Sequence, residues 1–118
     1  MLDLKIINGQ CYIDGELKNV DVSIKDGKIY NIGKITEESK NTIDAKGLTV
    51  LPGCIDTQTH FREPGSTDTE DLHSGSRAAI VGGITAVFEM PNTNPPTSTK
   101  KEFQRKLDLA KNRMYCNY

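Results

Sequence analysis

Residues 51–65 read LPGCIDTQTHFREPG, an apolar run that becomes polar before it reaches a Pro-Gly turn. The pattern predicts a buried strand over Cys54–Asp56 followed by a loop. Because alternate side chains of an extended chain share a face, four polar residues are expected on one side: Asp56, Gln58, His60 and Arg62. At the carboxyl end of a parallel strand, such a face is where α/β proteins build active sites. The alternative interpretation is a polar strand end that hydrogen-bonds only to neighbouring loops.

Helix and strand signals alternate downstream of this segment. The capping-box spacing of Thr67 and Glu70 predicts a helix over Asp68–Val81 that ends at Gly82-Gly83. Ile84–Met90 indicates a parallel strand covered on both faces. A second, amphipathic helix is expected after Thr99–Glu102, and Met114–Cys116 could begin another strand. This order is the start of a right-handed parallel α/β arrangement.

The first half of the chain alternates short β-prone runs with turn signals. The dipeptides Asn8-Gly9, Asp14-Gly15 and Asp26-Gly27 favour tight hairpin turns, which require positive φ. Val20–Lys25 alternates apolar and polar residues, so one face of that strand is expected to be buried. The half as a whole therefore predicts β structure.

Length and composition limit the class of protein. A chain of 118 residues has room for one domain of ordinary size, and the change of pattern at Pro52-Gly53 predicts a β-rich domain over 1–52 and the start of another over 53–118. The 15 Lys and Arg nearly balance the 16 Asp and Glu, which gives no electrostatic case for binding nucleic acid or an anionic membrane. Without a signal-peptide pattern or a long apolar run, a cytoplasmic protein is expected. The three cysteines lack a CxxC pair and are expected to be reduced.

Eight segments, two of them within residues 51–65, occur in order over roughly residues 20–97. They are VSIKDGKI (22–29), IDAKG (43–47), LPGCID (51–56), HFREPG (60–65), ED (70–71), SGSRAA (74–79), GGIT (82–85) and MPNTNPP (90–96). Together they resemble the amino-terminal portion of the dihydroorotases in the amidohydrolase superfamily. The resemblance implies an α/β protein with a β-rich amino-terminal segment of β-sandwich type, followed by the first β/α units of a TIM-like (β/α)8 barrel. Such a barrel needs ~250 residues, so it is expected to be incomplete and truncated here; an open three-stranded α/β sheet is the self-contained alternative.

The resemblance also implies a reaction and assigns site residues by position. Dihydroorotases open the ring of dihydroorotate in pyrimidine biosynthesis with a metal-activated water. His60 resembles the second histidine of their His-x-His metal motif, which implies zinc as cofactor, while Arg62 and Asn92 resemble the residues that hold the substrate carboxylate. The implied partner is a small carboxylated cyclic amide, and the whole enzyme is expected to be a homo-oligomer. Allantoinases tend to have Asn in place of Arg62 and dihydropyrimidinases lack the Arg-Glu-Pro-Gly run, which favours the carboxylated substrate.

Two departures from the family pattern limit the expected activity. Gln58 stands where the first histidine of the metal motif is usual, and an amide oxygen is a poor transition-metal ligand. The family's carboxylated lysine, later histidines and catalytic aspartate lie beyond residue 118, so no catalytic residue is assigned and the chain alone is expected to be inactive. Three alternatives stay open: a non-catalytic dihydroorotase-like scaffold or partner subunit, another cyclic amidohydrolase of the allantoinase or dihydropyrimidinase type, and a separate small anion-binding module.

Other polar residues have simpler interpretations. Arg62 could merely pair with Glu63 or Asp71. His73 has no ligand-spaced partner and is expected to be a surface or packing histidine, and Asp56 suits a structural role at the strand end. The acidic residues expected in the first helical turn, where the helix dipole favours them, are Asp68, Glu70 and Asp71.

Overall fold

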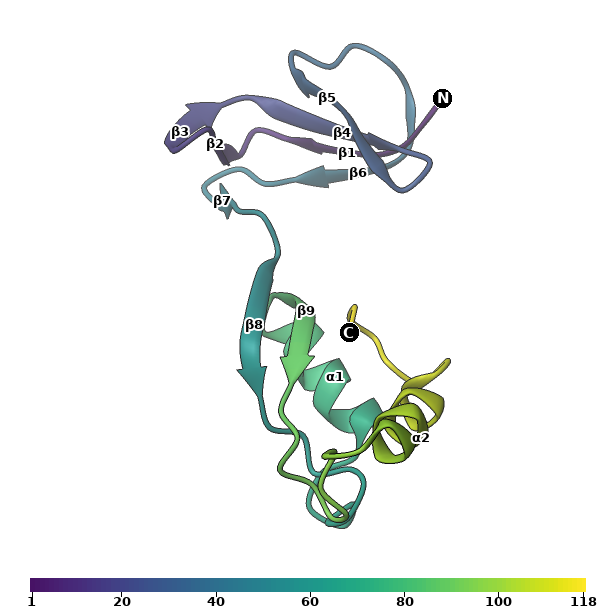
Figure 1. Cartoon of the computed structure of the whole chain (residues 1–118). Helices are drawn as coiled ribbons and strands as arrows, with labels where there is room; N and C mark the ends of the chain where they lie inside the picture. Colours follow the sequence, from purple (N-terminus) through teal and green to yellow (C-terminus); the bar gives the residue numbers. More distant parts are fainter. The chain divides into compact units, whose positions relative to one another are not determined.

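The computed structural model describes the whole chain, Met1–Tyr118. The residues form two compact units, Met1–Pro52 and Gly53–Tyr118, and each is described by itself (Figure 1). Neither of the chain's helices has the length and apolar character that a membrane crossing requires.

The first unit is built from strands. They are β1 (Leu2–Ile7), β2 (Gln10–Ile13), β3 (Glu16–Asn19), β4 (Asp21–Lys25), β5 (Lys28–Gly33), β6 (Ser39–Asp44) and β7 (Thr49–Val50). One sheet has the order β5-β4-β1-β6 and the other β3-β2-β7. Strands β1 and β6 are parallel, as are β2 and β7, and the remaining neighbours are antiparallel. The buried apolar residues of this unit are Leu2, Cys11, Val22, Ile35 and Ala45.

Two of the three expected hairpin turns are confirmed. Asp14-Gly15 joins β2 to β3, and Asp26-Gly27 joins β4 to β5. The φ angles are 53° and 85° at the first turn and 52° and 71° at the second. Both central residues are thus left-handed, as the twist of a two-residue hairpin demands.

The expectation for Asn8-Gly9 is wrong, because β1 and β2 belong to different sheets. Asn8 is left-handed with φ 63°, but Gly9 is not. Instead Gly9 is buried, and a Cβ there would lie 2.8 Å from Val50 Cγ2 and 2.9 Å from Ala45 Cβ. This glycine serves the close approach of chain segments rather than a hairpin.

Two further details of the first unit differ from the sequence pattern. Strand β3 was not expected, because its residues, ELKN, are mostly exposed and carry no apolar alternation. In β4, Val22 is buried as expected, but Ser23 on the opposite face is fully buried too. Its hydroxyl donates to the Asn31 carbonyl at 3.3 Å, beside an irregularity in the pairing of β4 with β5. The hydrogen bond offsets the cost of burying a hydroxyl.

The second unit alternates strands and helices. Its elements are β8 (Cys54–Thr59), α1 (Leu72–Val81), β9 (Ile84–Glu89) and α2 (Lys100–Ala110). Strands β8 and β9 are parallel neighbours. Phe61, Leu72, Val87, Ala110 and Cys116 form the buried core of this unit, which draws on both helices and β9.

Helix α1 begins four residues later than expected. Its N-cap is Asp71, which accepts a hydrogen bond from the Ser74 amide while the Ser74 hydroxyl accepts from the Asp71 amide. Residues 67–70 instead form turns in which the amides of Thr69 and Glu70 donate to the Ser66 carbonyl. The acidic residues expected in the first helical turn therefore precede the helix, and no acidic residue lies in that turn. At the other end, Gly83 takes the expected left-handed conformation with φ 87°.

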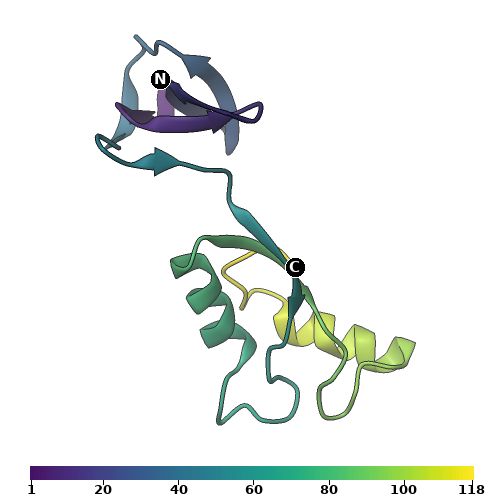
Figure 2. The ribbon, with the colours of Figure 1, turned by 90° about the vertical axis from the view of Figure 1, so that its left-hand side faces the viewer.

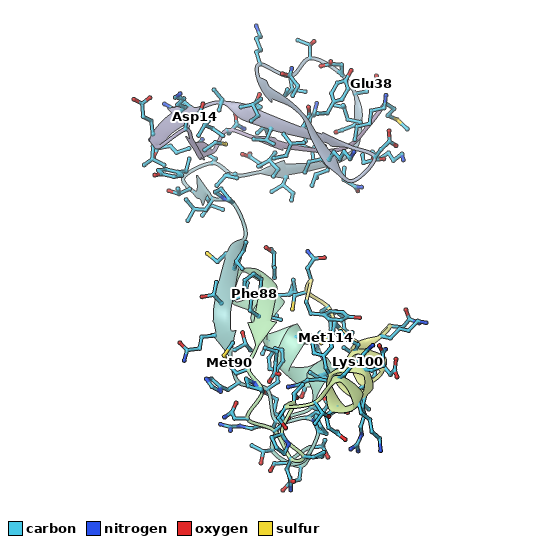
Figure 3. The ribbon with its side chains drawn as sticks, viewed as in Figure 1. Asp14, Glu38, Phe88, Met90, Lys100 and Met114 are labelled. Atoms are coloured by element: carbon cyan, nitrogen blue, oxygen red, sulfur yellow. The ribbon has the colours of Figure 1, made fainter.

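The remaining expectations for the second unit are met in part. Thr99 is the N-cap of α2, as its spacing to Glu102 predicts. The third strand is represented by one parallel bridge, between Ala86 and Asn117. Strand β9 is covered on one face only within this chain: Val87 is 2% exposed, whereas Phe88 is 59% exposed (Figure 3).

Candidate functional site

The predicted site residues lie at the carboxyl ends of the two parallel strands of the second unit. His60 and Arg62 follow β8, and Asn92 follows β9. The Met90 amide donates to the Thr59 carbonyl at 2.8 Å, which continues the strand pairing to the edge of the sheet. The loops that follow β8 and β9 lie at the same end of the unit in both views (Figures 1 and 2). The topology therefore brings residues from two loops to one edge, as parallel α/β folds do at their sites.

A side-chain contact joins these two loops. His60 Nδ1 lies 2.8 Å from Asn92 Oδ1. An amide oxygen only accepts hydrogen bonds, so this contact requires the hydrogen of the neutral imidazole to be on Nδ1. Nε2 then keeps its lone pair, and Asn92 Nδ2 remains a donor. The partner of Asn92 in the structure is thus His60 rather than Arg62.

Arg62 is exposed and makes no ion pair. The interpretation in which it merely pairs with Glu63 or Asp71 is wrong, because the cation at both carboxylates is Arg113. A guanidinium without an internal partner can bind an external planar anion through two parallel hydrogen bonds. Arg62 has the chemistry of an anion-binding group.

Glu63 was not singled out from the sequence, yet it is 7% exposed. Arg113 Nη1 donates to Oε1 at 2.7 Å, and Nη2 donates to Oε2 at 3.0 Å. The Leu72 amide at the start of α1 also donates to Oε2, at 2.9 Å. Burial alone would raise the pKa of Glu63, but the hydrogen bonds from Arg113 and Leu72 outweigh it and hold that pKa below its usual value. Glu63 is therefore a buried, ionised carboxylate.

A second ion pair, which is largely buried, lies at the end of β9. Glu89 pairs with Lys106 of α2, and the two side chains are 11% and 12% exposed. Lys106 Nζ also donates to the Met90 carbonyl at 3.0 Å. Burial raises the pKa of Glu89, although Lys106 and, more weakly, a hydrogen bond from the Phe61 amide oppose that shift. The pair anchors α2 to the start of the loop that carries Asn92.

The residues present do not fit a complete transition-metal site. His60 suits a ligand, since its Nδ1 is held by an oxygen and its Nε2 is available. Gln58 offers an amide in place of a second imidazole, and its backbone N–H donates to Asp56 Oδ1 at 2.9 Å, which gives Asp56 a structural contact. No group of three or more His, Cys, Asp or Glu side chains is close enough to hold a metal ion. One imidazole is too few for zinc, which takes three or four protein ligands.

The remaining candidate ligands have other partners or none. His73 packs edge-on against Tyr115, with ring centroids 5.0 Å apart and 3.2 Å between Nε2 and the hydroxyl. The prediction of a packing histidine is confirmed. All three cysteines are free, as expected.

The sequence model of the amidohydrolase family matches residues 49–116. The chain belongs to the amidohydrolase family. It is 43% identical to an allantoinase from Salmonella choleraesuis over 113 residues. The aligned region covers 95% of this chain and 25% of the allantoinase. It is 42% identical to a dihydroorotase from Methanosarcina mazei over 120 residues. That aligned region covers 100% of this chain and 26% of the dihydroorotase.

Solved structures agree with the fold. An L-hydantoinase (dihydropyrimidinase) from Arthrobacter aurescens superposes with a TM-score of 0.87 at 33% identity, over 98% of this chain and 26% of that one. The chain thus spans about a quarter of the length of these relatives. Its fold is the β-rich segment and the first β/α units of a TIM-like barrel found in amidohydrolases, as expected. Its relatives are cyclic amidohydrolases, which are generally metal-dependent enzymes.

Proposed function

We propose that this chain is the amino-terminal part of a cytoplasmic dihydroorotase, a cyclic amidohydrolase of pyrimidine biosynthesis whose substrate is the carboxylated ring of dihydroorotate. Sequence identity does not separate the substrates, since the chain is 43% identical to an allantoinase and 42% to a dihydroorotase. The observation that carries the proposal is Arg62, an exposed guanidinium that makes no ion pair and follows His60 by two residues, in the loop that the His60–Asn92 contact joins to the next one. A carboxylate on the ring would supply the missing partner.

Each of the three residues has a role that its geometry supports. Arg62 binds the carboxylate through its planar fork. Asn92 holds His60 through Oδ1 and offers Nδ2 to the same ligand. Zinc is the proposed metal of the complete enzyme, with His60 Nε2 as one ligand and the others outside this chain. We assign no reaction step to the metal, because this chain's residues do not form its site.

The remaining proposals concern the whole protein. Residues 1–52 are proposed as a β-rich domain and residues 53–118 as the start of the metal-dependent hydrolase barrel. The complete enzyme is proposed to be a homo-oligomer. The 118 residues alone, supplied with zinc, are expected to open no ring, because a single imidazole does not hold a catalytic ion.

Gln58 favours a second candidate, a non-catalytic relative that keeps the scaffold and serves as a partner subunit. Elemental analysis of a full-length protein carrying this chain, compared with its Gln58→His variant, separates the two functions. An active dihydroorotase retains at least one tightly bound ion with Gln58 in place. A scaffold binds no metal until His is introduced.

Substrate choice is tested with Arg62→Lys in the full-length protein. Lysine keeps the charge but loses the bidentate geometry, and a charged hydrogen bond of this kind contributes about 1.5 to 3 kcal/mol. The expected loss in kcat/KM toward dihydroorotate is therefore roughly tenfold to hundredfold. An uncharged ring such as dihydrouracil or allantoin should be much less affected.

The matched control is Arg105→Lys, an exposed arginine of α2 that pairs with Glu102 at 3.5 Å. It should change neither rate. Equal losses on charged and uncharged rings in Arg62→Lys would mean that Arg62 supports the fold instead. Higher activity on allantoin than on dihydroorotate in the unmodified protein would favour the allantoinase type.

A further inference from the structure

Arg113 lies near the carboxyl end of the second unit's sequence and contacts the loop that carries the proposed site residues His60 and Arg62. Arg113 lies in the turn after α2, fifty residues from Glu63 in the sequence. Besides its two hydrogen bonds to Glu63, it donates to the Leu109 carbonyl at 3.1 Å and lies 3.5 Å from Asp71 Oδ2. The guanidinium is thus fixed to α2, to the N-cap of α1 and to the loop after β8 at once.

Glu63 links the loop after β8 to other parts of the second unit. It directly follows Arg62, and its Oε2 accepts from the Leu72 amide, so one side chain ties the middle of the loop to the start of α1. The next residue, Pro64, accepts a hydrogen bond at its carbonyl from the Asn94 amide at 2.9 Å. Residues 63 and 64 therefore connect the loop that carries His60 and Arg62 with the loop that carries Asn92.

The electrostatics favour a rigid arrangement. Both carboxylate oxygens of Glu63 are engaged, and its lowered pKa keeps it ionised at neutral pH. A bidentate pair of arginine and carboxylate is directional as well as strong. Residues 65–69 of this loop are exposed, and without an anchor the loop would sample many conformations, which would scatter the groups that must meet a ligand together.

We propose that Arg113 is a positioning residue, which acts through Glu63 to hold Arg62 and His60 in register with Asn92. The ligand-binding consequence rests on the proposed function, whereas the coupling of the two loops does not. The competing explanation is that the Arg113–Glu63 pair stabilises the second unit as a whole and has no particular effect on the loops.

Amide hydrogen exchange in the 118-residue chain separates the two explanations. The Asn94 amide reports on the contact between the loops, and the Val87 amide, which donates to the Asn117 carbonyl at 2.9 Å, reports on opening of the core. In Arg113→Lys and Arg113→Met, exchange of the Asn94 amide should accelerate at least about tenfold more than exchange of the Val87 amide, because local opening is uncoupled from global unfolding. Arg113→Lys should show the smaller effect, since it keeps the charge.

Arg105→Met is the control, because it removes an arginine of α2 without touching either loop. It should leave the ratio of the two exchange rates unchanged. If the Arg113 variants accelerate both amides by the same factor, the pair is merely structural and the proposal is wrong. Should Arg113→Met unfold, Arg113→Lys still provides the ratio.

A second readout addresses the ligand. Dihydroorotate is titrated into a full-length protein carrying this chain, and binding is followed by calorimetry, with dihydrouracil as the uncharged probe. Arg113→Lys should weaken dihydroorotate binding about tenfold and leave any dihydrouracil binding unchanged. If the unmodified full-length protein binds no dihydroorotate, the proposed function loses its support, and the exchange ratio in the 118-residue chain still decides whether Arg113 positions the loops.

Discussion

The hairpin turns of the first unit and the strand-to-helix loops of the second are held by different kinds of interaction. Asp14-Gly15 and Asp26-Gly27 turn the chain by their own left-handed backbone, and the second turn gains one long-range hydrogen bond, from the Asp26 amide to Asp3 Oδ2 at 2.7 Å. The loops after β8 and β9 are instead held by two ion pairs whose carboxylates are largely buried, Glu63 with Arg113 and Glu89 with Lys106, although Arg113 itself is 35% exposed. By contrast, the Asp3–Lys40 pair of the first unit is 36% and 56% exposed. The largely buried carboxylates thus lie next to the loops that carry the candidate site.

The largest expected effect is that of Lys106→Met, which leaves the buried Glu89 without its cation. Removing one partner of a buried pair is strongly destabilising, and we expect a loss of about 3 kcal/mol at neutral pH. The loss should shrink on acidification, because the pKa of Glu89 is raised and a protonated carboxyl needs no cation. Urea unfolding followed by helical circular dichroism measures the second unit alone, since the first contains no helix.

Its counterpart in the first unit is Lys40→Met, which breaks the exposed Asp3–Lys40 pair. No measurable change is expected in the urea unfolding midpoint of the first unit, followed by the NMR amide signals of its own strands, because solvent screens exposed pairs. Equal losses in Lys106→Met and Lys40→Met would remove the distinction between the two units.

An effect smaller than that of Lys106→Met is expected from Gly75→Ala in α1. Alanine normally stabilises a helix relative to glycine, but here the added Cβ would lie 2.6 Å from Phe61 Cδ1 and 2.7 Å from Cε1. Overpacking of this kind should cost about 2 kcal/mol. The comparison is Gly15→Ala, where the new Cβ meets no atom and only the φ of 85° opposes it, at about 1 kcal/mol. Thermal unfolding checks both, and a more stable Gly75→Ala protein would contradict the tight packing of α1 on Phe61.

The smallest expected effect is the pH dependence of the stability that Glu63 contributes. Its folded pKa lies below the usual 4.5, so its contribution to stability is complete above pH 4.5 and is lost as the pH falls through the folded pKa. Glu63→Gln should be less stable than the unmodified chain at neutral pH and should lose less additional stability on acidification. Urea unfolding midpoints measured on both sides of pH 4.5 give the two slopes, and parallel slopes would show that Glu63 does not gain from being ionised.

The same contrast explains what the sequence could and could not predict. The Asp-Gly hairpins and the N-cap of α2 follow from residues within a few positions of one another, and these expectations hold. Gly9 was misread because its neighbours, Val50 and Ala45, are far away in the chain. The start of α1 was misplaced because Asp71 and Ser74 compete with an equally good spacing at Thr67 and Glu70.

The site shows the same division between local and distant signals. His60 and Arg62 stand out from the alternation at the end of a strand, and Asn92 was found through the family resemblance. Glu63 was passed over as a flanking charge, and Arg113 reads as one more cation near the polar face of α2. The two residues are fifty positions apart, and no periodic pattern in the sequence predicts that they pair. Only the fold reveals that the supporting charges belong to the site.

The central claim is that the loops after β8 and β9 form one site through the contact of His60 with Asn92. A long-range proton–nitrogen NMR spectrum of the 118-residue chain, taken where the imidazole is neutral, reports which ring nitrogen carries the hydrogen. The chain has two histidines, so a His73→Gln variant assigns the signals. The expected result is hydrogen on His60 Nδ1, with a shift of population toward Nε2 in Asn92→Ala. Hydrogen on Nε2 in the unmodified chain, unaffected by Asn92→Ala, would show that the two loops do not meet as described.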